Sequence, residues 1–132
     1  MADRSPNRLQ AYIDRYEIDQ AVLSTANTNR DGDTGTYVTL ATGRDPFSQV
    51  VKVQIKATGT TTAGMIRFFH DDGADLKLIH EENVAAATPS ASVQTDEITW
   101  TPSNLVLGDG ELLKGSTHNA ETFHVTTTLG NF

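Results

Sequence analysis

Short segments that alternate between apolar and polar residues recur along this chain, and turn residues separate them at intervals of roughly 8–12 residues. Between residues 48 and 57, for example, Val51, Val53 and Ile55 alternate with lysine and glutamine. A period of two is typical of a β-strand with one buried and one solvated face. Helical crossovers between the segments are missing, which argues against a parallel α/β sheet. The pattern therefore predicts about eight strands in an all-β chain.

Threonine supports the same fold class, because it is β-branched and the chain of 132 residues contains nineteen of them. A chain of this length fits one domain and can bury a sizeable core. We therefore expect an all-β fold, an antiparallel β-sandwich of the jelly-roll type, with an open barrel as the alternative.

The first twenty residues differ from the rest, because their apolar residues follow a helical spacing. Leu9, Tyr12, Ile13 and Tyr16 stand at positions i, i+3, i+4 and i+7, and Ser5 can cap a helix that begins at Pro6. This spacing predicts a short amphipathic helix over residues 6–17. The alternative is an extended arm that docks these side chains on a neighbour. The predicted organisation is a helix or arm over residues 1–20 and a β-sandwich over residues 21–132.

The clearest local unit is a β-hairpin, in which residues 64–70 and 74–81 flank the turn Asp71-Asp72-Gly73. A three-residue loop predicts the register of the two strands. In this register Phe68 pairs with Leu76, Ile66 with Leu78, and Arg67 with Lys77. The apolar pairs then share one face. Two cations opposite each other predict that solvent or an acidic side chain lies nearby.

Charge and cysteine content exclude several classes of protein. The chain has no cysteine, so disulfides and thiolate metal sites are excluded. Its net charge is −7 and no run of lysine and arginine occurs, so we expect no nucleic-acid partner. No apolar stretch follows the first residues, so we expect neither a secretory signal nor a membrane-spanning segment.

Two groups of residues carry metal-binding side chains. Residues 27–33 resemble the start of a calcium loop, but position 12 of that loop would be Val38 rather than the bidentate glutamate. His118, Glu121 and His124 could form a site only if the fold gathers them, and histidines on a β surface are the more common explanation. We predict no metal and no cofactor.

No motif places a base beside a nucleophile, so we expect a protein that is not an enzyme. Trp100 shares a strand face with Ile98, which favours a place in the core or at its rim over a platform for sugar stacking.

Several segments between Ala63 and Thr127 resemble small β-rich virion proteins of tailed bacteriophages. They are Met65-Ile66-Arg67-Phe68-Phe69, Leu76-Lys77-Leu78-Ile79-His80-Glu81, Ala87-Thr88-Pro89-Ser90-Ala91, Leu105-Val106-Leu107 and Ser116-Thr117-His118-Asn119-Ala120-Glu121-Thr122-Phe123. The last of these is the most specific. The resemblance covers about half of the chain and transfers no catalytic residue.

Among such proteins, the resemblance points to capsid decoration, or cement, proteins. It implies a structural protein on the capsid exterior, made in the host cytoplasm, which stabilises the shell through contacts with the major capsid protein and as a homotrimer. Leu9, Tyr12, Ile13 and Tyr16 are then the candidate interface residues. The alternative interpretation of these residues is that they cover one end of the sandwich's own core. The alternative function is a carbohydrate-binding module associated with a tail or head fibre.

Overall fold

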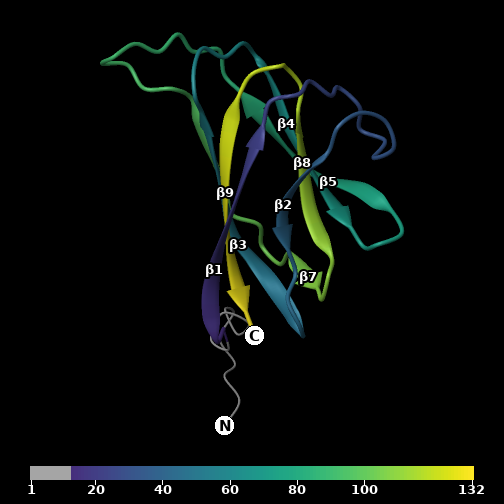
Figure 1. The fold of residues 1–132 in the computed structure, drawn as a ribbon. Helices are drawn as coiled ribbons and strands as arrows, with labels where there is room; N and C mark the ends of the chain where they lie inside the picture. Colours follow the sequence, from purple (N-terminus) through teal and green to yellow (C-terminus); the bar gives the residue numbers. More distant parts are fainter. Residues whose placement is uncertain (1–12) are drawn as a thin grey trace.

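The alternating segments form nine β-strands in the computed structural model, which describes residues 13–132 (Figure 1). The strands are β1 (Arg15–Leu23), β2 (Val38–Thr42), β3 (Phe47–Ala57), β4 (Gly64–Asp71), β5 (Leu76–Val84), β6 (Glu97–Trp100), β7 (Val106–Gly108), β8 (Leu112–Thr117) and β9 (Phe123–Asn131). Residues 13–132 contain no helix that is long and apolar enough to cross a membrane.

The strands form two antiparallel sheets. The first has the order β1-β9-β3-β6, with β7 also paired to β3, and the second has the order β2-β8-β4-β5. The first strand therefore pairs with the last, the second with the one before it, and β4 pairs with β5 at the centre of the chain. A long hairpin whose successive strand pairs alternate between two sheets is a jelly roll. The predicted all-β sandwich of the jelly-roll type is confirmed.

The core lies between the two sheets and is built from the inward-facing residues of both. Phe68, Phe123, Leu107, Leu113 and Leu129 are fully buried, and smaller aliphatic side chains fill the space between them. This packing follows from the period of two, because alternate residues of each strand reach the same interior.

The β4–β5 hairpin is present, but its predicted register is wrong. Phe68 lies opposite His80 and Arg67 opposite Glu81, because the turn is longer and the register shifts between Phe68 and Phe69. The expected conflict between Arg67 and Lys77 therefore does not arise. An acidic side chain stands directly opposite Arg67 instead.

The helix predicted over residues 6–17 is wrong for residues 15–17, which belong to β1. β1 pairs with β9 along its whole length, from Arg15 opposite Asn131 to Leu23 opposite Phe123. Helix propensity is a weak local preference that such a ladder overrides. β1 also crosses residue 20, the predicted boundary between the arm and the sandwich. Leu9 and Tyr12 lie outside the described residues.

Candidate functional site

The candidate interface residues that the structure describes lie at the start of β1. Tyr16 leaves 62% of its surface exposed, so it is not part of the sandwich core. Ile13 is partly buried, and its side chain lies against Gly130 where a Cβ atom would stand. Gly130 is opposite Tyr16 in the β1–β9 ladder, so both side chains meet the same end of the first sheet.

β1 carries an exposed apolar stripe on its outer face, formed by Tyr16, Ile18 and Val22 and called the β1 stripe below. Ile18 is 55% exposed and Val22 50% exposed. Three of the five large exposed apolar side chains among residues 13–132 thus lie on one face of one strand. Ile18 and Val22 follow the alternation of residues 15–23, but the helical spacing of Leu9, Tyr12, Ile13 and Tyr16 does not include them.

The rest of this sheet face is polar. Val22 stands opposite His124 and Ile18 opposite Thr128 on β9, and β3 continues these rows with Lys56 and Lys52. An apolar stripe with polar residues beside it is the usual composition of a protein-binding surface.

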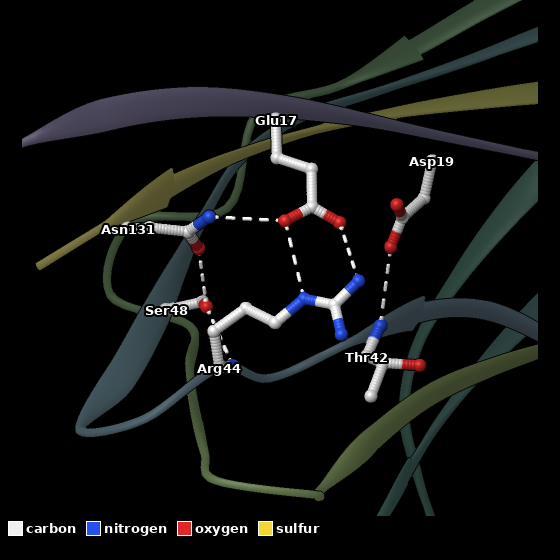
Figure 2. Close-up of polar contacts among 6 residues, drawn as sticks. All are labelled: Glu17, Asp19, Thr42, Arg44, Ser48 and Asn131. Carbon is white, nitrogen blue, oxygen red and sulfur yellow. Dashed lines mark hydrogen bonds and ion pairs between the residues drawn. The ribbon is translucent and has the colours of Figure 1, made fainter.

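The inward face of β1 begins with a network of polar side chains, shown in Figure 2. The Arg44 guanidinium donates to both carboxylate oxygens of Glu17, from Nε at 3.2 Å and from Nη2 at 2.9 Å. Asn131 donates to the same carboxylate at 3.0 Å and accepts from the Ser48 hydroxyl at 2.6 Å. The network, called the β1 clamp below, joins β1, β9, β3 and the β2–β3 turn.

Glu17 in the β1 clamp and Asp19 beside it on the same strand have opposite pKa shifts. Hydrogen bonds from Arg44 lower the pKa of Glu17 to about 2, and Asn131 contributes to the same shift. Burial raises the pKa of Asp19 above its ordinary value, and the neighbouring Glu17 adds to the effect. Asp19 accepts a hydrogen bond from the backbone N–H of Thr42 at 3.3 Å. The contact between Asp19 and Thr42 links the edge strands of the two sheets, β1 and β2.

The second sheet is covered on its outer face by residues 24–37, the connection between β1 and β2 (Figure 1). Asn27 is buried and its backbone N–H donates to Thr117 of β8. Tyr37 packs edge-on against the buried Phe69, with ring centroids 4.8 Å apart. The connection thus closes this face with side chains of the chain itself.

A charged cluster lies under the same connection. Glu81 pairs with the exposed Arg30 at 2.7 Å and with Arg67 at 3.0 Å, and the Arg67 side chain is only 3% exposed. Hydrogen bonds from Arg30, and then from Arg67, lower the pKa of Glu81. His118 Nδ1 stands 3.4 Å from the Arg67 guanidinium. These contacts connect β4, β5, the residue that follows β8 and the β1–β2 connection, which indicates a structural role.

In residues 27–33, which resemble the start of a calcium loop, the Asp31 carboxylate accepts hydrogen bonds from the loop itself. Asp31 accepts hydrogen bonds from the backbone N–H groups of Asp33 and Thr34, which lower its pKa, and from the Tyr37 hydroxyl. Gly32 and Gly35 have positive φ angles, which explains the glycines at these turns.

The histidine group is not brought together as a metal site. His118 faces Arg67, and Glu121 accepts from Thr62. Within residues 13–132, no three side chains of His, Asp or Glu are grouped so that they could hold a metal ion.

Trp100 contacts two other rings. His80 stacks on it at a centroid distance of 4.3 Å, Phe68 approaches it at 4.6 Å, and Trp100 packs against the core. The expected place at the rim of the core is confirmed. His80 covers one face of the indole, so that face is not open for stacking on a sugar.

Comparison with known proteins shows that the chain is similar to solved structures in its fold. No family model matches the sequence, and no curated protein matches it. A chain of the acidic stable capsid of Helicobacter pylori bacteriophage KHP30 is similar, with a TM-score of 0.56 and 11% identity over 87% of this chain and 86% of that one. Two other solved structures have weaker similarity. They are a pentameric capsid protein from metagenomic phage sequences (TM-score 0.44, 16% identity, 86% and 61% coverage) and the Clostridium thermocellum xylanase 10B modules (TM-score 0.42, 15% identity, 88% and 26% coverage).

Proposed function

We propose that this protein is a structural component of a bacteriophage virion that decorates the capsid and stabilises it through protein–protein contacts, without catalysis. The observation that supports this most directly is the similarity of its jelly roll, over most of both chains, to a chain of a phage capsid. The finer parts of the proposal are an exterior position, the major capsid protein as partner, and a homotrimer.

The surface of the sandwich supports a role in binding. The β1 stripe exposes three large apolar side chains on a strand that is otherwise held firmly by β9 and the β1 clamp. A rigid strand that presents apolar side chains loses little conformational entropy when it binds, so its exposed area contributes efficiently to affinity. Trimeric association would repeat the stripe three times, which increases the avidity for a repeating shell.

The proposal is tested by adding the purified protein to phage heads that lack it and measuring co-sedimentation and the mass of the free protein. We expect saturable binding at a fixed ratio to the major capsid protein and a trimeric mass in solution. A monomer that does not sediment with the heads contradicts the proposal.

A matched pair of variants connects this test to the structure. Ile18→Glu places a charge in the β1 stripe, whereas Val93→Glu places one at an equally exposed apolar residue outside β1, and the two side chains are 55% and 54% exposed. We expect Ile18→Glu to lower head binding by about tenfold or more and Val93→Glu to leave it unchanged, because a charge in an apolar contact is desolvated. If both variants lose head binding to the same extent, the β1 stripe is not part of the interface.

A further inference from the structure

We infer that the capsid surface that receives the β1 stripe is acidic and sets carboxylates against Lys52 and Lys56 of β3. The inference rests on the proposed role in capsid binding and adds to it the chemistry of the partner. Three observations carry it: the area of the stripe, the distribution of ion pairs over the chain, and the position of the two lysines beside the stripe.

The area of the stripe is too small for a stable contact by itself. Its three side chains are 50–62% exposed and offer on the order of a few hundred Å² of surface. A stable contact buries about 800 Å² on each partner. Because β1 is an edge strand, the sheet face continues from the stripe only across β9 and then β3. A partner of ordinary size that is seated on the stripe therefore also covers the outer side chains of these two strands.

The ion pairs of the chain leave two lysines of this face without a carboxylate partner. Of the eight lysine and arginine residues within residues 13–132, five form ion pairs with carboxylates of the same chain. The other three, which form none within this part of the chain, are Arg15 at the start of β1 and Lys52 and Lys56 on β3. The Lys56 ammonium donates to the Thr95 carbonyl at 2.9 Å, which holds its position without neutralising its charge. A partner can therefore supply the carboxylates that these lysines lack.

Both lysines are aligned with the stripe. Lys52 lies in the same cross-strand row as Ile18, and Lys56 lies in the same row as Val22, with one β9 residue between them in each row. Two strand spacings correspond to about 10 Å. This distance is close to the Debye length at about 0.1 M salt, so charges on a partner that covers the stripe act on both lysines. One partner surface can therefore contact the apolar and the cationic residues together.

The charge of this face is opposite to that of the whole protein. Glu97, opposite Lys56, is the one carboxylate among the outward-facing residues of β1, β9, β3 and β6. With histidine neutral, Lys52, Lys56 and Glu97 give the face a charge of +1, whereas the whole chain carries −7. An acidic partner attracts this face and repels the rest of the protein, so the charges orient the protein on its partner. The apolar stripe beside the lysines fits a protein surface rather than a nucleic acid.

The inference is tested by the rate at which the purified protein binds phage heads that lack it. Lys52→Glu reverses one charge beside the stripe. Lys77→Glu is the matched control, because it changes the net charge equally on a 75% exposed side chain of β5, in the second sheet. We expect Lys52→Glu to slow binding by about fivefold or more and Lys77→Glu by about twofold or less, because only Lys52 faces the partner. Equal rates for the two variants would overturn the inference.

Salt and a conservative replacement sharpen the test. Raising the NaCl concentration from about 0.05 M to about 0.5 M should slow binding of the unchanged protein by about tenfold, because salt screens the attraction between exposed charges. The same change should slow Lys52→Glu much less. Lys52→Arg should keep both the rate and its salt dependence, because it keeps the positive charge. A binding rate of the unchanged protein that does not fall with salt would overturn the inference.

The outcomes separate this inference from the proposed function. If the unchanged protein does not bind the heads, the proposed function is contradicted, and the inference that depends on it falls as well. If the protein binds but neither Lys52→Glu nor salt slows binding, the proposed function stands and the inference alone is overturned. If Lys52→Glu changes the mass of the isolated protein and leaves head binding unchanged, this face is a contact between copies of the chain, which also overturns the inference.

Discussion

The outer faces of the two sheets are completed in different ways. On the second sheet, residues 24–37 cover the strands, and both Arg67 and Phe69 are almost fully buried although they do not belong to the core between the sheets. On the first sheet, the β1 stripe stays exposed beside a polar surface. The first arrangement contributes to the stability of the isolated domain, and the second leaves apolar area for a partner. Substitutions on the two faces should therefore affect different properties.

The largest expected difference is between two aromatic residues. Phe69→Ala should lower the free energy of unfolding by about 3–5 kcal/mol, because it opens a cavity under the connection. Tyr16→Ala should change it by about 0.5 kcal/mol or less, since its ring is mostly exposed. Denaturant unfolding measures both. If both variants lose the same free energy of unfolding, the β1 stripe also stabilises the isolated domain.

The next-largest change in the free energy of unfolding is expected at the charged cluster under the β1–β2 connection. Glu81→Gln leaves the buried Arg67 without its acid, and we expect a loss of about 2 kcal/mol at neutral pH. Glu82→Gln is the matched control, because Glu82 is equally exposed (29% against 30%) but, among residues 13–132, forms an ion pair only with His80. A loss with Glu81→Gln no larger than with the control would indicate that solvent, rather than Glu81, compensates the charge of Arg67.

The β1 clamp should show a smaller, pH-dependent effect. The pKa of Glu17 is lowered from 4.5 to about 2, so its ionised form stabilises the fold above pH 4.5 and this contribution is lost as the pH falls towards 2. Glu17→Gln should cost about 1 kcal/mol at neutral pH and remove this part of the acid dependence. Unfolding measured between pH 7 and 2 tests it, and an unchanged acid profile in the variant would contradict it.

The smallest expected effect has the opposite sign. The pKa of Asp19 is raised, so its ionisation destabilises the fold as the pH rises through the raised value. Asp19→Asn keeps an oxygen that can accept from the Thr42 N–H and removes the charge beside Glu17. We expect a gain of about 0.5 kcal/mol at neutral pH that disappears in acid. Destabilisation at neutral pH would mean that the Asp19 charge is needed for the clamp.

The fold class was predictable because it depends on local patterns that repeat. Alternation and turn residues located the strand at residues 48–57 and the two strands of the β4–β5 hairpin to within a few residues. Tyr16 is exposed as part of a strand and not of the predicted helix, and the helical spacing did not indicate its neighbours Ile18 and Val22. Whether the N-terminal residues form an interface stays a prediction.

The sequence by itself determined that this protein is an all-β sandwich, because the period of two and the spacing of turns are encoded residue by residue. Only the tertiary structure decided how strands far apart in the chain pair: the β1–β9 ladder, the register that sets Arg67 against Glu81, and the joining of Glu17 to Arg44 and Asn131. The physical reason is that such contacts depend on which strand edges meet across the whole chain, and the sequence pattern within each strand is compatible with several such pairings.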